Sequence, residues 1–177
     1  MNYWLIADSN LEVIMSNQNY WNDIVNTLIE KGLTIATMES CTGGGIANVI
    51  TNVSGASAVL SESYVTYSNE AKIKQGVRAS VIEKYTVYSL ETAVEMAKAV
   101  KVKAGTDFGI GVTGQLGRID PNNPAESLNV VWVAIETSDN EVYVKEIRVP
   151  DFERMEQKDY VINIIARFLL NCFNIKR

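Results

Sequence analysis

The chain has 177 residues, of which 47% are hydrophobic and 21% charged, a balance typical of one globular domain with a sizeable core. Its net charge of −5 argues against broad electrostatic binding to nucleic acid, and the apolar opening before Asp8 is too short for a membrane span or a signal peptide. With Cys41 and Cys172 as the only cysteines, we expect no disulfide framework, and the cytoplasm is the expected location.

The chain contains no histidine. This excludes a Ser-His-Asp triad, a Cys-His pair and a histidine-ligated zinc site, and two cysteines cannot form a four-cysteine zinc site. A nucleophile in this protein therefore needs lysine, tyrosine or a carboxylate as its base. No residue pattern requires a metal or an organic cofactor.

Residues 18–177 are predicted to form one domain, because no repeat or linker divides them. Residues 1–17 form an N-terminal extension in which 3–7 and 11–15 could pair as a hairpin. The alternation of helices and strands, with one hairpin, predicts a three-layer α/β/α sandwich on a mixed sheet. The predicted elements are a helix over 21–31, a strand over 33–38, a helix over 43–52, a strand over 62–68, helices over 70–74, 80–85 and 89–104, strands over 107–113, 128–136 and 142–149, and a final helix that begins at 150–151.

Several local signals support these boundaries. Asn69, Ser80 and Ser89 precede predicted helices and are expected to be N-caps, and glycines end other helices. The glycines within the strand over 107–113 indicate close approach of another backbone. Residues 115–127 are predicted to be an exposed loop, of a length that is often functional.

The stretch that organises the chain follows the strand over 33–38 and reads Thr37-Met38-Glu39-Ser40-Cys41-Thr42-Gly43-Gly44-Gly45. A strand that turns through small residues into a helix leaves backbone N–H groups without helical partners. Those groups suit a phosphate, a carboxylate or an oxyanion. Ser40 is placed there as a nucleophile or an anion clamp, although an ordinary N-cap with a glycine-rich turn fits the spacing equally well.

Four motifs in order carry a family resemblance: Met38-Glu39-Ser40-Cys41-Thr42-Gly43-Gly44, Ser54-Gly55-Ala56-Ser57, Val65-Thr66-Tyr67-Ser68-Asn69-Glu70-Ala71-Lys72 and Gly111-Val112-Thr113-Gly114. Over roughly residues 18–170 the chain resembles the C-terminal domain of the CinA (competence/damage-inducible) family. The family's molybdopterin-binding-like domain is not found, so the resemblance predicts a stand-alone domain. Active family members are nicotinamide mononucleotide deamidases, which implies hydrolysis of this carboxamide to nicotinate mononucleotide and ammonia. Because family members commonly self-associate, the resemblance also implies a homodimer.

The resemblance implies that Ser40 is the nucleophile and that Tyr67 and Lys72 complete the catalytic set. A lysine of lowered pKa or a tyrosine could take the Ser40 proton, which leaves the base unassigned. Taken alone, Tyr67 also fits a cross-strand packing residue, and Lys72 an exposed helix charge. The Cys41 thiol fits a small buried residue better than a nucleophile. The candidate substrate-binding residues are Cys41, Thr42, Gly43, Gly44, Thr113, Gly114 and Arg118.

Two hypotheses remain, the first supported by the intact Ser40, Tyr67 and Lys72 and the second by an altered loop over 114–129. The family continues Val-Thr-Gly with Ile-Ala-Gly-Pro and a glycine-rich loop, whereas this chain continues with Gln115-Leu116-Gly117-Arg118. Arg118 either pairs with a phosphate or is a solvated loop charge. The first hypothesis is an amidohydrolase that acts on a pyridine mononucleotide or a close relative through Ser40, Tyr67 and Lys72. The second is a catalytically silent nucleotide-binding or regulatory module.

Overall fold

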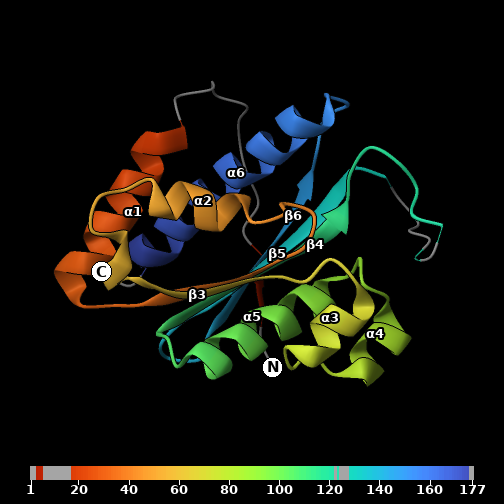
Figure 1. Cartoon of the computed structure of the whole chain (residues 1–177), viewed down its shortest axis with the longest axis horizontal. Coiled ribbons are helices and arrows are strands. Elements are labelled where there is room, and N and C mark those ends of the chain that lie inside the picture. Colours follow the sequence, from red (N-terminus) through yellow and green to blue (C-terminus); the bar gives the residue numbers. More distant parts are fainter. Residues whose placement is uncertain (1–2, 6–16, 122, 124–127, 176–177) are drawn as a thin grey trace.

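The computed structural model describes residues 3–5, 17–121, 123 and 128–175, which form a three-layer α/β/α sandwich (Figure 1). The predicted fold class is thereby confirmed. The elements are β1 (Tyr3–Leu5), α1 (Asn17–Lys31), β2 (Ile35–Glu39), α2 (Gly45–Thr51), the 3₁₀ helix η1 (Ala56–Ala58), β3 (Leu60–Val65), α3 (Asn69–Lys74), α4 (Ala79–Tyr85), α5 (Leu90–Ala104), β4 (Phe108–Gln115), β5 (Val130–Glu136), β6 (Val142–Arg148) and α6 (Arg154–Ile175).

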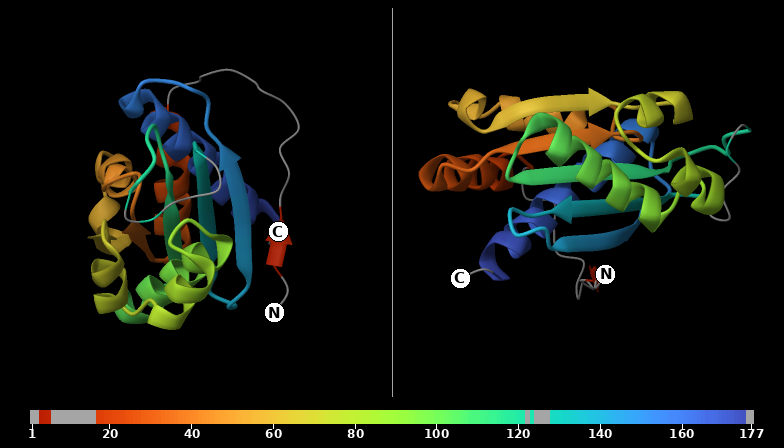
Figure 2. Two further views of the ribbon diagram at one scale, coloured as in Figure 1. Left: turned by 90° about the vertical axis from the view of Figure 1, so that its right-hand side faces the viewer. Right: turned by 90° about the horizontal axis from the view of Figure 1, so that it is seen from below.

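The described strands form one mixed sheet in the order β1-β6-β5-β4-β2-β3. Strands β3, β2 and β4 run parallel, β5 is antiparallel to both of its neighbours, and β1 runs parallel to β6. Helices α1, α2 and α6 cover one face of this sheet, and α3, α4 and α5 cover the other (Figures 1 and 2). The carboxyl ends of β2, β3 and β4 therefore share one edge of the sheet, where parallel α/β folds place their ligands.

Helix α5 packs closely onto β4 because that strand has glycine where the two elements touch. A Cβ atom added to Gly109 would lie 2.1 Å from the carbonyl oxygen of Ala97, and one added to Gly111 would lie 2.2 Å from that of Ala93. The predicted close backbone approach is confirmed. The opposite face of the sheet holds the larger apolar core, which α1 and α6 close with side chains such as Trp21 and Phe168.

Helix starts differ in detail from the sequence prediction. Ser89 caps α5 as expected, since its hydroxyl accepts a hydrogen bond from the backbone N–H three residues on. The cap of α3 is Ser68 rather than Asn69, which is the first helical residue. Ser80 lies inside α4, whose N-cap position is taken by Arg78 without a side-chain cap.

Three strand and helix boundaries also differ. Strand β3 ends at Val65, so the predicted strand over 62–68 is too late and Tyr67 belongs to a turn into α3. Strand β1 pairs with β6 rather than within a hairpin, and residues 11–15 lie outside the described residues. Helix α6 begins at Arg154, three residues or more after the predicted start. No helix in the described part of the chain is both long and apolar enough to cross a membrane.

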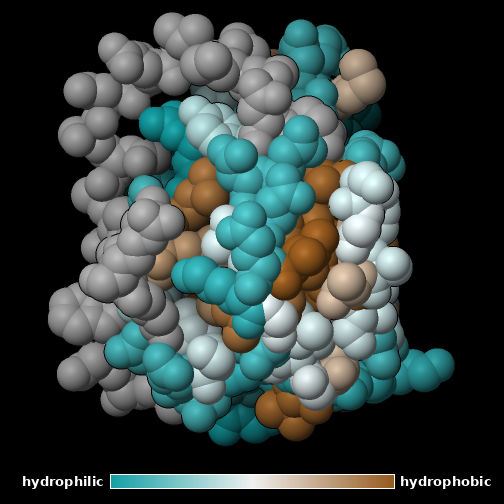
Figure 3. All heavy atoms as spheres, turned by 90° about the vertical axis from the view of Figure 1, so that its left-hand side faces the viewer, coloured by the Kyte–Doolittle hydropathy of each residue, from teal (hydrophilic) through white to brown (hydrophobic). Residues whose placement is uncertain are grey.

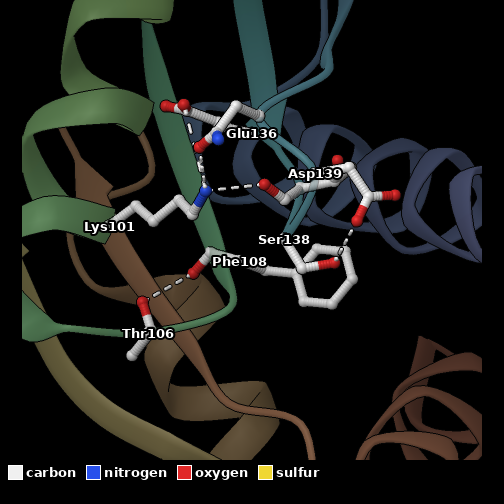
Figure 4. Close-up of polar contacts among 8 residues, drawn as sticks. Lys101, Thr106, Phe108, Glu136, Ser138 and Asp139 are labelled. Carbon is white, nitrogen blue, oxygen red and sulfur yellow. Dashed lines mark hydrogen bonds and ion pairs between the residues drawn. The ribbon is translucent and has the colours of Figure 1, made fainter.

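At the edge of the sheet opposite the carboxyl ends of β2, β3 and β4, polar contacts join α5 to the β5–β6 turn (Figure 4). Lys101, near the end of α5, donates hydrogen bonds to the carbonyl of Thr137 at 2.7 Å and to Asn140 Oδ1 at 2.8 Å. Lys101 thus connects α5 to the turn between β5 and β6.

The surface of the molecule at the left of Figure 1 carries hydrophilic residues interleaved with hydrophobic patches (Figure 3).

Candidate active site

Ser40 and Lys72 meet at the carboxyl edge of the parallel strands. Ser40 directly follows β2, and its N–H donates to the carbonyl of Val112 at 3.0 Å, which holds the turn against β4. Lys72 comes from α3, and its Nζ donates hydrogen bonds to Ser40 Oγ at 3.1 Å and to the carbonyl of Thr66 at 2.7 Å. Lys72 is only 2% exposed and Ser40 8%, so Lys72 is not a solvated helix charge.

Burial changes the acid–base chemistry of Lys72. Loss of solvent around the ammonium group lowers the pKa of Lys72 from 10.5 to about 8, and the Cys41 thiol acts in the opposite direction. Its two hydrogen-bond acceptors are a hydroxyl and a carbonyl, which stabilise an ammonium less than a carboxylate would. The amine is therefore available in its neutral form near physiological pH, in contact with a serine hydroxyl.

Cys41, the residue after Ser40, is buried. It is 4% exposed and packs into the apolar core beneath α1 and α6. Burial raises the pKa of the Cys41 thiol to about 12, so this sulfur stays protonated and is a poor nucleophile.

Glu39 stabilises the turn between β2 and α2 through hydrogen bonds, a role that no sequence pattern predicted. Its buried carboxylate accepts hydrogen bonds from the Thr42 hydroxyl at 2.7 Å and from the backbone N–H groups of Gly44, Ile46 and Ala47 at 3.0, 3.1 and 2.9 Å. These are the donors that open α2, so a protein carboxylate fills the position suggested for a bound anion. The sequence feature that could have indicated this role is a glutamate at the end of a buried strand, shortly before the glycines.

The turn retains fewer free donors than its glycines suggest. The N–H of Gly43 donates to the carbonyl of Ser40 at 3.1 Å. Among the described residues, the backbone N–H groups of Cys41 and Thr42 donate to no backbone carbonyl, and that of Cys41 contacts only its own thiol. An oxyanion beside Ser40 would thus meet those two groups, rather than the N–H of Gly44 or the hydroxyl of Thr42.

Thr113 lies next to Ser40 in the sheet, because the β2–β4 register pairs Glu39 with Val112 one residue earlier. Its hydroxyl donates a 2.6 Å hydrogen bond to the carbonyl of Val87, and the residue is fully buried. Gly114 pairs with Val131, and a Cβ atom at Gly114 would lie 2.6 Å from the Val131 Cα. Glycine at this position therefore lets β5 pack against β4.

Tyr67 stands at the rim of the site and is 63% exposed. Its hydroxyl accepts a hydrogen bond from Arg154 Nη2 at 2.9 Å, and Arg154 Nη1 donates to the carbonyl of Leu116 at 2.6 Å. Within the described residues, Tyr67 forms no hydrogen bond to Ser40 or Lys72. Arg154 therefore connects the segment before α3 to the loop after β4. Because Arg154 begins α6, far from both segments in the sequence, no local motif predicted its role.

Lys158 adds a second cation from α6. Its Nζ lies 3.2 Å from the position of a Cβ atom on Gly43, so the amine stands directly above the glycine-rich turn. Arg154 and Lys158 are four residues apart and lie on one side of the helix. Arg118 is exposed on the loop after β4, and its side chain has no hydrogen bond or ion pair with another described residue.

The fold and this geometry define a three-layer α/β domain with a buried serine–lysine pair at the carboxyl edge of its parallel strands. The sequence model of the CinA C-terminal domain matches residues 17–173. The chain belongs to the CinA C-terminal domain family.

Named relatives agree with this assignment. The chain is 43% identical over 113 residues to a CinA-like protein of Kosmotoga olearia, and 41% identical over 153 residues to a provisionally named competence-damage inducible protein of a Thermoanaerobacter species. These matches cover 63% and 84% of this chain. They span only 27% and 37% of the length of the two relatives.

Solved structures have the same fold. The competence/damage inducible protein CihA of Agrobacterium tumefaciens superposes with a TM-score of 0.80 at 26% identity, covering 91% of this chain and 98% of that one. A competence or damage-inducible protein of Enterobacter asburiae gives a TM-score of 0.82 at 22% identity, over 90% of this chain and 99% of its own.

Proposed function

We propose that this protein is an amidohydrolase that converts nicotinamide mononucleotide to nicotinate mononucleotide and ammonia, with Ser40 as nucleophile and Lys72 as its base. The observation that carries the proposal is the 3.1 Å contact between Lys72 Nζ and Ser40 Oγ, made by a lysine that is almost fully buried. In a chain without histidine, a desolvated lysine amine is the group best suited to activate a serine.

The chemistry proceeds in two balanced steps. In the first, the neutral amine of Lys72 takes the Ser40 proton while Oγ bonds to the amide carbon. The resulting tetrahedral intermediate loses its C–N bond, and the leaving nitrogen takes the proton back from Lys72 and departs as ammonia. In the second, water attacks the ester on Ser40, again giving its proton to Lys72, and the carboxylic acid leaves as Ser40 is reprotonated.

Two groups of donors suit the two charged parts of such a substrate. The backbone N–H groups of Cys41 and Thr42 lie beside Ser40 and would stabilise the oxyanion of the tetrahedral intermediate. Arg154 and Lys158 bring two positive charges to the rim, next to the exposed Gly43. A phosphate group is a good ligand for such a pair, because arginine can bind it through two parallel hydrogen bonds.

The contacts favour Lys72 over Tyr67 as the base. Lys72 already contacts the nucleophile, whereas the Tyr67 hydroxyl is occupied by Arg154. We assign Tyr67 a positioning role, in which it holds the arginine over the site.

The direct test is release of ammonia from nicotinamide mononucleotide by the purified chain. We expect turnover in the parent, none in Ser40→Ala, and full activity in Ser138→Ala, a matched control on an exposed turn at the far edge of the sheet. Turnover that persists in Ser40→Ala would overturn the proposal. Mononucleotide binding that survives Ser40→Ala, with no turnover of any amide by the folded parent, would instead support a catalytically silent nucleotide-binding module.

A further inference from the structure

Gln115, the last residue of β4, has a buried side chain without a hydrogen-bond partner among the described residues. The residue is 3% exposed, and neither its Oε1 nor its Nε2 is bonded to any of them. A buried amide without partners destabilises the folded state, and buried polar groups are otherwise almost always paired. An amide kept at this position therefore points to a ligand that completes its hydrogen bonds.

The strand pleat directs Gln115 to the face of the sheet that carries the reacting groups. Side chains alternate along β4, and Val112 belongs to the core beneath α1 and α6. Thr113 and Gln115 therefore face the other side, where Thr113 contacts Val87. Ser40 faces this side too, because Met38, two residues before it, packs against α5.

The distances along the strands place Gln115 within reach of a substrate at Ser40. Two residues of a strand span about 7 Å, and Ser40 and Thr113 are neighbours across adjacent strands about 4.8 Å apart. A glutamine side chain can cross much of that diagonal. The next carbonyl along the chain, that of Leu116, already binds Arg154 at the rim. Gln115 is thus joined to the chain segment that Arg154 binds.

We propose that Gln115 determines specificity by pairing its amide with the primary carboxamide of the substrate. Its Oε1 accepts a hydrogen bond from the substrate NH₂ group, and its Nε2 can donate to a carbonyl oxygen of the same ligand. The acid product has no NH₂ to donate and brings a second acceptor instead, so Gln115 favours the amide over the carboxylate. This inference rests on the proposed function, because it takes the same site and the same reaction.

The test compares substrate and product binding in a variant that cannot turn over. In Ser40→Ala, isothermal titration should show that nicotinamide mononucleotide binds at least about tenfold more tightly than nicotinate mononucleotide. Adding Gln115→Met, which keeps the shape and removes both hydrogen bonds, should weaken amide binding about tenfold or more and reduce the amide-to-acid ratio toward one. Gln115→Glu, which keeps an acceptor for the NH₂ group, should restore preference for the amide.

A kinetic and a stability readout separate this role from a structural one. In the Ser40-intact chain, Gln115→Met should raise KM for ammonia release about tenfold with kcat changed less than threefold, and it should raise the thermal midpoint because an unpaired buried amide is removed. A higher midpoint with unchanged KM and unchanged amide-to-acid ratio would overturn the proposal while leaving the amidohydrolase assignment intact. Loss of the binding ratio in a chain without turnover would support Gln115 as a ligand contact and count against the hydrolase.

Discussion

The Lys72 amine donates a 3.1 Å hydrogen bond to the Ser40 hydroxyl, and it lies in a site where burial lowers its pKa to about 8. A base acts only in its deprotonated form, so kcat/KM for ammonia release should rise about tenfold per pH unit below 8 and level off above it. A pH profile from 6 to 9.5 measures this. A flat profile, or one that falls as the pH rises, would contradict Lys72 as the base.

Removing the buried amine should make the protein more stable as well as inactive. Protonation of Lys72 costs the folded state free energy below pH 8, and this cost disappears as the pH rises toward the unfolded pKa of 10.5. The lowered pKa of Lys72 corresponds to a destabilisation of roughly 3 kcal/mol, which Lys72→Met removes. The substitution also removes two hydrogen bonds that contribute about 1 kcal/mol each. Lys72→Met should therefore gain about 1–2 kcal/mol in urea unfolding at pH 7.

The same comparison has an internal control. The gain from Lys72→Met should shrink or reverse at pH 10.5, and activity should fall by about 10²–10⁴-fold at all pH values. Lys74→Met, on the exposed side of the same helix, should change neither property. Destabilisation of Lys72→Met at pH 7 by more than about 1 kcal/mol would show that the amine stabilises the fold.

Glu39 should be the most sensitive polar residue of the turn. Its carboxylate accepts hydrogen bonds from three backbone N–H groups and the Thr42 hydroxyl. Glu39→Gln replaces one acceptor oxygen with an NH₂ group that faces other donors, so we expect a loss of about 2–4 kcal/mol in the free energy of unfolding. Chemical denaturation measures this loss, with Glu70→Gln as a control at an exposed glutamate. Equal free energies of unfolding for the two variants would show that Glu39 does not stabilise the turn.

Tyr67→Phe distinguishes a positioning residue from a base. The variant loses the acceptor for Arg154 but no contact to Ser40, so KM should rise several-fold while kcat changes by less than about fivefold. Its stability should be close to that of the parent, because the side chain is largely exposed. Steady-state kinetics distinguish the two roles. A decrease in kcat of about 10²-fold or more at unchanged KM would indicate that Tyr67 is the base.

Gly111→Ala tests the packing of α5 on the sheet. The added methyl group would lie 2.2 Å from the carbonyl oxygen of Ala93, a backbone atom that cannot move without displacing the helix. We expect a loss of about 3 kcal/mol or more, or failure to fold. Gly105→Ala has free space around it and should show only the smaller cost of its positive φ, which makes it the matched comparison.

The parts of the fold that could be predicted are those that local patterns determine. Apolar spacing places α1 and α5, and the glycines of β4 indicate the close helix, because each depends on residues within one element. The sequence alone cannot fix the cap of α3, because Ser68 and Asn69 are both good N-cap residues and the end of β3 decides between them.

The site was predictable only where a motif contains it. Ser40 and Lys72 fall in two such motifs, and the structure brings them together. Arg154 and Lys158 reach the site through the packing of α6, which no nearby residues reveal. Glu39 lies within a motif, but only the structure shows that its carboxylate occupies the α2 donors expected to face an anion.

The most direct measurement of an activated serine uses a fluorophosphonate, which reacts with nucleophilic hydroxyl groups whatever the natural substrate. Mass spectrometry of the labelled chain should find one adduct, on Ser40, that forms faster as the pH rises through about 8 and is lost in Lys72→Met. A folded chain that takes up no label, or one labelled at Ser40 at the same rate without Lys72, would contradict the serine–lysine mechanism.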